Sequence, residues 1–293
     1  MIKKLSLAVL AFSFIAISVH AQDDLLSMLG DEEQEVERVT NAFKSNRVIG
    51  SHSMEHVAAG VLDFRIMHRF GSLETGLYEI FGLDQATIRL GFDYGITDRL
   101  TAGVGRSSLN KEFDGFLKYR LLWQSEGKKK IPLSIILVSG MTMNTLKWSD
   151  PDRKNYFSSR LGYYHQIIFG RKFSEAFTFQ LSPVLVHRNL VEKNSDKHDI
   201  LAVELGTRLK LNKRIAITAD YFYVLPNQLR DENTNPLSIG FDIETGGHVF
   251  QLHFTNAPAM NERAFIADNT GSWSKGDIHF GFNISRVFTL SSK

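Results

Sequence analysis

The chain has no cysteine, few prolines and no long apolar run after its first twenty residues or so. The absence of cysteine among 293 residues excludes disulfides, thiolate metal sites and a lipid-anchored N-terminal cysteine. No later stretch approaches the roughly 20 apolar residues of a membrane-spanning helix. Basic and acidic side chains are nearly balanced, 34 against 32, so the charge gives no reason to expect nucleic acid as a partner.

The N-terminus has the pattern of a secretory signal peptide. Lys3 and Lys4 are followed by the apolar stretch from Leu5 to Val19, and Ala21 supplies a small residue before cleavage. The alternative is an N-terminal membrane anchor, although the apolar stretch is short for one. We therefore predict a signal peptide over residues 1–21 and an exported mature chain. Residues 22–60, acidic at first, are expected to form a partly flexible periplasmic segment.

From Val61 onward the hydropathy pattern has a period of two. In "VLDFRIMHRF", Leu62, Phe64 and Ile66 lie on one face, and Asp63 and Arg65 lie on the other. The same alternation recurs in "TIRLGFDYG", "GFLKYRLLWQ", "SSRLGYYHQIIFG", "ILAVELGTRLKL", "IAITADYFY", "LSIGFDIET" and "DIHFGFNIS". Each segment is therefore predicted to be a strand with one apolar and one charged face.

Three features favour a membrane barrel over a soluble β-sandwich, the alternative. Aromatic residues lie near strand ends, the strands are about ten residues long, and short and long connections alternate along about twelve strands. We predict an all-β fold: a transmembrane antiparallel up-and-down β-barrel over residues 61–293. Two segments fit less well, "IPLSIILVSGMTM", which is apolar on both faces, and "FTFQLSPVLV", where Pro183 is expected at a bulge or edge.

Several long stretches resemble a family of bacterial outer-membrane β-barrels known as a domain of unknown function. They are "FRIMHRFG", "DYGITDRLTAGVGRSS", "FDGFLKYRLL", "QLSPVLVHRNL", "LSIGFDIETGGHVFQLHFTN" and "FGFNISRVF". The resemblance runs from about Phe43 to Phe288. It implies an outer-membrane location in a Gram-negative cell and no particular activity. The last strand, ending near Phe288, is similar to the closing strand that barrel-assembly machinery reads.

Two patterns could carry catalysis. His52, Glu55 and His56 form H-x-x-E-H, a spacing that holds zinc in one class of metalloprotease, but Gly50 and Gly60 leave little room for the helix it requires. A solvated periplasmic segment is the preferred interpretation. On the lipid face, His165 and His187 are weak candidates for a lipase-type site, with rim positions as the alternative. We therefore predict no enzyme activity, no catalytic residues, no cofactor and no metal site.

The charged faces of the strands are predicted to line the lumen. The candidate pore-lining residues are Asp63, Arg65, Arg89, Asp93, Lys118, Arg120, Arg160, Glu204, Arg208, Asp220, Asp242 and Glu244. Buried charges must be paired or hydrated, so two functions remain open. The favoured one is a porin-like channel or transporter for small polar solutes. The alternative is a structural or partner-binding barrel whose lumen is closed by ion pairs. The expected partners are outer-membrane lipid, the assembly machinery and a small polar solute, but not nucleic acid.

Overall fold

A computed structural model describes residues 35–246 and 248–291 and divides the chain into two compact units. The predicted signal peptide and residues 22–34 lie outside the described residues. The described residues of the smaller unit, 35–37 and Ser125–Lys130, contribute to a two-stranded sheet of β1 (Val36–Arg38) and β6 (Ser125–Gly127). The larger unit, Arg38–Gln124 with Ile131–Lys293, contains the barrel.

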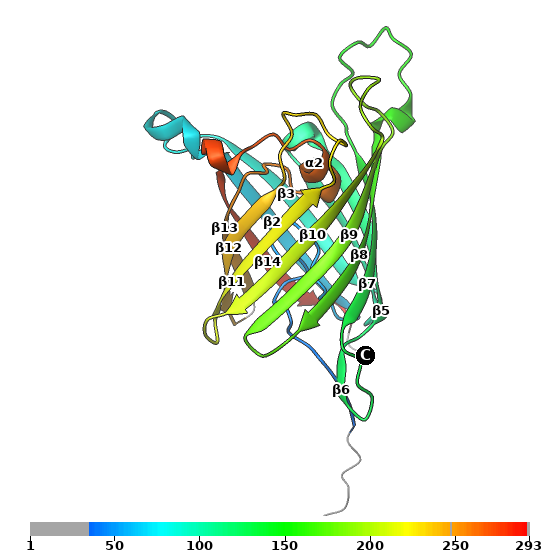
Figure 1. Cartoon of the computed structure of the whole chain (residues 1–293), viewed down its shortest axis with the longest axis vertical. Coiled ribbons are helices and arrows are strands. Elements are labelled where there is room, and N and C mark those ends of the chain that lie inside the picture. The colour runs from blue at the N-terminus through cyan, green and yellow to red at the C-terminus, as the bar shows by residue number, and fades with distance from the viewer. Residues whose placement is uncertain (1–34, 247, 292–293) are drawn as a thin grey trace, which may run out of the picture. The chain divides into compact units, whose positions relative to one another are not determined.

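Twelve antiparallel strands close into a barrel, as the sequence predicts (Figure 1). They are β2 (Val61–Ser72), β3 (Ala86–Gly95), β4 (Leu100–Ser107), β5 (Phe113–Leu122), β7 (Ser134–Met143), β8 (Leu161–Lys172), β9 (Phe177–Arg188), β10 (Asp199–Lys210), β11 (Ile215–Val224), β12 (Leu237–Thr245), β13 (His248–Thr255) and β14 (His279–Thr289). The first and last strands pair with each other, with Leu62 opposite Phe288. Because every strand has two neighbours, the sheet leaves no open edge.

Burial alternates along the strands in step with the sequence pattern. On β5, Lys118 and Arg120 are buried inside the barrel, whereas Leu117, Tyr119 and Leu121 are exposed on its outer surface. Large apolar side chains are exposed on the outer rows of most strands, which is the surface that a bilayer would cover. No helix in the described part of the chain is long and apolar enough to cross a membrane.

The connections give the barrel two different ends. At the short-turn end, residues 96–99, 123–133, 173–176 and 211–214 join the strands, as does the short link that follows Thr245. At the long-loop end, the links are residues 73–85, 108–112, 144–160, 189–198, 225–236 and 256–278. Two links depart from the predicted alternation: residues 108–112 are few for a long loop, and the 123–133 link is lengthened because it contains β6.

Pro183 lies inside β9 rather than at an edge. It pairs with Val203 of β10, but the β8–β9 ladder has no partners between Gln166–Val184 and Phe169–Leu181. The pairs on both sides of this gap have the same register. Pro183 therefore interrupts the ladder without a bulge, because proline has no N–H to donate.

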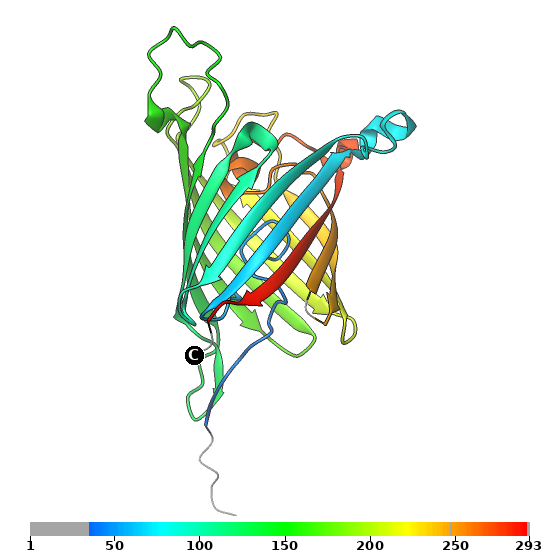
Figure 2. The same ribbon diagram turned by 180° about the vertical axis from the view of Figure 1, so that it is seen from behind.

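Residues 41–57 lie inside the barrel, where the sequence analysis expected a solvated segment outside it. Figure 2 shows this part of the chain, in blue, within the ring of strands. Phe43, Val48, Ile49 and His52 are all almost completely buried. The expectation of a solvated segment is therefore wrong for these residues. It failed because the contacts that hold them come from strands more than a hundred residues away in many cases. We call residues 41–57 the lumen hairpin.

From the opposite end, the 256–278 loop folds into the barrel and carries α2 (Glu262–Ala267). Asn261 caps this short helix by accepting a hydrogen bond from the Ala264 N–H. Phe265 and Ile266 of α2 are buried, and the ring centroids of Phe265 and of Phe222 on β11 lie 4.9 Å apart. The lumen is thus filled from both ends.

Candidate functional site

The lumen hairpin enters and leaves the barrel at the short-turn end. An antiparallel bridge joins Arg47 to His52, and the Val48 N–H donates to the Ser51 carbonyl at 2.9 Å, so residues 48–51 form the tip. The incoming limb begins beside β9, where Thr178 donates to the Ala42 carbonyl, and the outgoing limb leads through Gly60 into β2. Both limbs therefore use one mouth, and the tip lies deepest.

The tip binds the carboxylate of Asp220 on β11. The N–H groups of Ile49, Gly50 and Ser51 all donate to one oxygen of this carboxylate, at 3.2, 2.8 and 3.0 Å. The Ser51 hydroxyl donates to Glu204 on β10 at 3.1 Å. Converging N–H groups of this kind form an anion-binding concavity, which accounts for the buried Asp220 carboxylate.

The hairpin carbonyl groups also accept hydrogen bonds from polar side chains of the wall. The donor–acceptor pairs are Thr178–Ala42, Lys118–Asn46, Gln251–Val48, Asn283–Ile49, Gln180–His52, Arg120–Met54 and Lys118–Glu55. The side-chain oxygen of Gln180 in addition accepts from the Met54 N–H. Most hydrogen bonds from the wall to the hairpin thus involve main-chain atoms of the hairpin.

A buried ion pair joins the hairpin to α2. The Arg47 guanidinium lies 2.6 Å from the Glu262 carboxylate, and both side chains are almost fully buried. Burial opposes the charge of Arg47, but the adjacent Glu262 carboxylate raises its pKa. Burial also raises the pKa of Glu262, against the opposing effect of Arg47. The pair joins the two insertions where they meet inside the barrel.

The H-x-x-E-H residues do not converge. His52 is buried beside Tyr164 and Phe116, with Nε2 3.3 Å from the Tyr164 hydroxyl. Glu55 instead accepts hydrogen bonds from N–H groups of its own hairpin. Burial and the nearby Lys118 charge lower the pKa of His56 to about 2. Among the described residues, no group of three His, Asp or Glu side chains could hold a metal ion.

Most of the predicted pore-lining charges are buried inside the barrel. These are Asp63, Arg65, Arg89, Asp93, Lys118, Arg120, Glu204, Arg208, Asp220 and Asp242. Some pair within the wall: Arg65 with Asp63 at 2.5 Å, and Arg89 with Asp114 through two hydrogen bonds. Others contact the hairpin, as Asp93 does through Asn46 at 3.0 Å.

Two of the predicted residues lie near the barrel ends. Glu244 is partly exposed at the short-turn end, 3.1 Å from Lys44. Arg160 lies outside the strands, in the 144–160 loop, where it donates to the carbonyls of Asn144 and Leu146 and its guanidinium lies over the Trp148 ring. The lumen assignment of Arg160 was therefore wrong, because β8 begins at Leu161, three residues after the start of the predicted segment at Ser158.

A pocket lies at each end of the barrel. At the short-turn end, a pocket of about 420 Å³ is lined by residues that include Lys44, Glu55, Asp63 and Glu244. At the long-loop end, a pocket of about 640 Å³ is lined by loop residues that include Arg188, Asp196, Arg230, Arg263 and Asp268. Both linings contain charges of both signs.

The lumen also contains an apolar cluster. Inward side chains of β7–β11 form a buried cluster with Phe43, Val48 and Met54 of the hairpin and with α2; its wall members include Ile136, Val138, Ile168, Val184, Val186, Ile200, Phe222 and Val224. The alternation alone did not reveal this cluster, because the inward rows of β8–β11 mix apolar side chains with polar ones. The hairpin therefore meets both polar and apolar side chains of the same strands.

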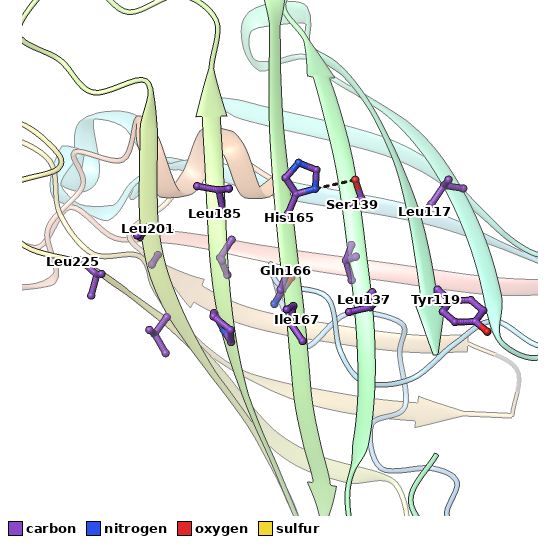
Figure 3. A pocket seen from close by; sticks show the side chains of 15 residues that line it. Leu117, Tyr119, Leu137, Ser139, His165, Gln166, Ile167, Leu185, Leu201 and Leu225 are labelled. Carbon is purple, nitrogen blue, oxygen red and sulfur yellow. Dashed lines mark hydrogen bonds between the residues drawn. The ribbon is translucent and has the colours of Figure 1, made fainter. Parts of the chain in front are cut away.

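The outer wall has a shallow apolar pocket of about 580 Å³ beside the interrupted ladder at Pro183 (Figure 3). Ser139 and His165 lie opposite each other there on β7 and β8, with Oγ 3.0 Å from Nδ1. His187 contacts Asp199 and Asn189 instead. No described hydrogen bond supplies His165 with the third, orienting partner of a catalytic triad, so the pair gives no support to a lipase site.

Sequence reasoning missed the hairpin and several partners of the wall charges. Gln180, Gln251 and Asn283 occupy inward positions of predicted strands, so the period of two could have identified them as lumen-facing. Asp114 belongs to β5, but the predicted strand began one residue later, at Gly115. Glu262 lies in a loop, and nothing in its sequence context places it inside the barrel.

The fold and this lumen define a closed membrane β-barrel filled by its own chain. A family model described as a membrane bound beta barrel domain (DUF5777) matches residues 43–288. The chain belongs to this family, as the sequence resemblance predicted. The matched region includes the lumen hairpin from Phe43 onward.

Solved structures of outer-membrane proteins are similar at low sequence identity. The NanC porin is 11% identical, with 78% of this chain and 98% of the porin covered and a TM-score of 0.49. An outer membrane channel from Pseudomonas putida F1 is 14% identical, with 80% and 98% covered and a TM-score of 0.46. The outer membrane protein Omp33 from Acinetobacter baumannii is 7% identical, with 78% and 97% covered and a TM-score of 0.42. A search of curated proteins finds no match.

Proposed function

We propose that the protein is a non-enzymatic outer-membrane channel for small polar solutes, held closed in this conformation by the lumen hairpin. The observation that carries the proposal is the way the lumen is filled. A separate chain segment occupies it, bound largely through hydrogen bonds to polar wall side chains such as Lys118, Gln180 and Asp220. Water can replace such contacts, so withdrawal of the hairpin would leave a conduit lined in part by hydrated polar side chains.

The proposed location follows from the predicted signal peptide and the closed, apolar outer surface. A barrel satisfies all of its strand hydrogen bonds internally and can therefore lie in hydrocarbon. The short turns would face the periplasm and the long loops the exterior. The strand that ends near Phe288 pairs with β2 to close the barrel, which suits a role of this strand in recognition by assembly machinery.

The second candidate is a structural barrel with a permanently closed lumen. The apolar cluster around Val186, Ile200 and Phe222 favours it, because exposing these side chains to water would be unfavourable. Ion pairs such as Arg89–Asp114 also stiffen the wall without any solute.

Planar-bilayer recordings on three full-length proteins can separate the two functions. Arg47→Glu would place two carboxylates in contact in the buried closure and should expel the hairpin tip, whereas Lys213→Glu reverses an exposed charge in the 211–214 turn. The chain has no native cysteine, so Ser51→Cys, buried in the tip, reports hairpin release by thiol labelling.

If the protein is a channel, the wild-type and Lys213→Glu proteins should show rare openings, and the Arg47→Glu protein should show frequent openings. If Ser51→Cys labelling shows the hairpin released in the Arg47→Glu protein, and that protein still does not conduct, the channel proposal fails and the structural barrel stands.

A further inference from the structure

The wall of the lumen makes more hydrogen bonds to the main chain of the hairpin than to its side chains, of which Ser45, Asn46, Ser51 and His52 also bond the wall. Carbonyl groups along both limbs accept hydrogen bonds from side chains of the wall. N–H groups of the tip and of Met54 donate hydrogen bonds to side-chain oxygens of the wall. By contrast, the side chains of Phe43, Val48 and Met54 contribute apolar packing. Main-chain hydrogen bonds are common to all peptides, whereas side-chain packing selects among them.

The wall groups that bind the hairpin are strongly polar and deeply buried. Lys118, Gln180, Asp220 and Gln251 are each almost inaccessible to solvent. A buried polar group left without a partner is costly. These groups therefore require water or another molecule with the same alternation of donors and acceptors whenever the hairpin leaves.

The hairpin can leave without threading through the barrel, because both limbs use the short-turn end. The main side-chain link across the closure is Arg47–Glu262. On the outgoing limb, the backbone passes so close to Gly95 of β3 that a Cβ there would lie 2.0 Å from the Ala58 carbonyl oxygen. At the short-turn end, too, the wall therefore lies against the main chain of the outgoing limb at Ala58.

We infer that the lumen wall is a main-chain recognition site for a short peptide, and that residues 41–57 occupy it as an internal stand-in for that peptide. The inference rests on the proposed function and narrows its solute class from small polar molecules to short peptides. A peptide entering this site would take the carbonyl and N–H contacts of the hairpin, with Asp220 binding successive N–H groups at a turn.

The test measures binding of a fluorescein-labelled peptide of residues 41–57 to the full-length protein by fluorescence anisotropy. Arg47→Glu expels the internal hairpin while the free peptide still carries Arg47 and can pair with Glu262. The peptide should bind the Arg47→Glu protein at least tenfold more tightly than wild type or the Lys213→Glu control.

Two modified peptides test what the wall recognises. A peptide N-methylated at Ile49 and Ser51 should lose at least tenfold in affinity, because two N–H groups that reach Asp220 are removed. A peptide of the same composition in shuffled order should lose less. The reverse ranking, with N-methylation tolerated and shuffling not, would overturn main-chain recognition.

Hairpin release must be measured in the same samples by labelling of Ser51→Cys. If Arg47→Glu does not release the hairpin, Gly95→Ala is the second variant, because its Cβ would collide with the Ala58 backbone. A hairpin that stays in place in both variants overturns the inference, as does a released hairpin with no peptide binding. Peptide binding without conductance would support the site and reject the channel, so the two failures are distinguishable.

Discussion

Acidification should loosen the lumen hairpin through His56. In the closed barrel, burial and the charges of Lys118 and Arg120 lower the pKa of His56 to about 2. Once the hairpin is released, the pKa should return to about 6.5. Because the released state then binds more protons below that pH, the closed state loses stability as the pH falls.

The magnitude follows from these two values. Between pH 7.5 and pH 5.5 the released state gains almost one proton at His56, while the closed state gains almost none. The corresponding loss is about 1.4 kcal/mol, or about tenfold in the closing equilibrium. His52 is buried next to Arg47, and its pKa is lowered well below the ordinary value, so it acts in the same direction. Glu262, whose pKa is raised, opposes them.

The assay isolates His56 by comparing Ser51→Cys proteins with and without His56→Gln. Their labelling rates are divided by that of an exposed Ser274→Cys control at each pH, which corrects for thiol ionisation. Between pH 7.5 and pH 5.5, the corrected labelling rate of the protein that retains His56 should rise about tenfold more than that of the His56→Gln protein. Equal pH dependence in the two backgrounds would refute the reasoning.

Two further predictions concern the wall. Phe241→Arg places a charge on the outer face of β12, where Phe241 is half-exposed. This charge should destabilise the barrel in lipid by about 2–4 kcal/mol if residue 241 lies near the midplane of the bilayer. Unfolding in urea measures the free-energy cost, and a cost near zero would reject the lipid-facing assignment. Gly140→Ala introduces a Cβ 2.2 Å from the Tyr164 ring inside the lumen and should lower the free energy of unfolding by about 1–3 kcal/mol. Gly115→Ala, whose Cβ would make ordinary contacts of 3.5 Å and longer, should leave the free energy of unfolding nearly unchanged. Equal unfolding midpoints for the two variants would contradict the lumen packing.

The period of two and the alternating link lengths were enough to predict a closed barrel of about twelve strands. They are local properties: a strand that separates lipid from lumen must alternate, whatever its partners are. The same rule identified Lys118, Glu204 and Asp220 as inward-facing. It assigned Arg160 wrongly because alternation does not show at which residue a strand begins.

What fills the lumen was decided only by the tertiary structure. Residues 41–57 have no regular period, and their main-chain groups are satisfied by side chains from strands throughout the barrel, such as Asp220 and Gln251. Likewise, the partner of Arg47 is Glu262, 215 residues away in sequence. Sequence periodicity specifies which way a strand side chain points, but a segment without periodicity is placed by the long-range contacts available to it. Whether the inward charges line an open pore or hold a chain segment therefore depended on contacts that form only when the barrel closes.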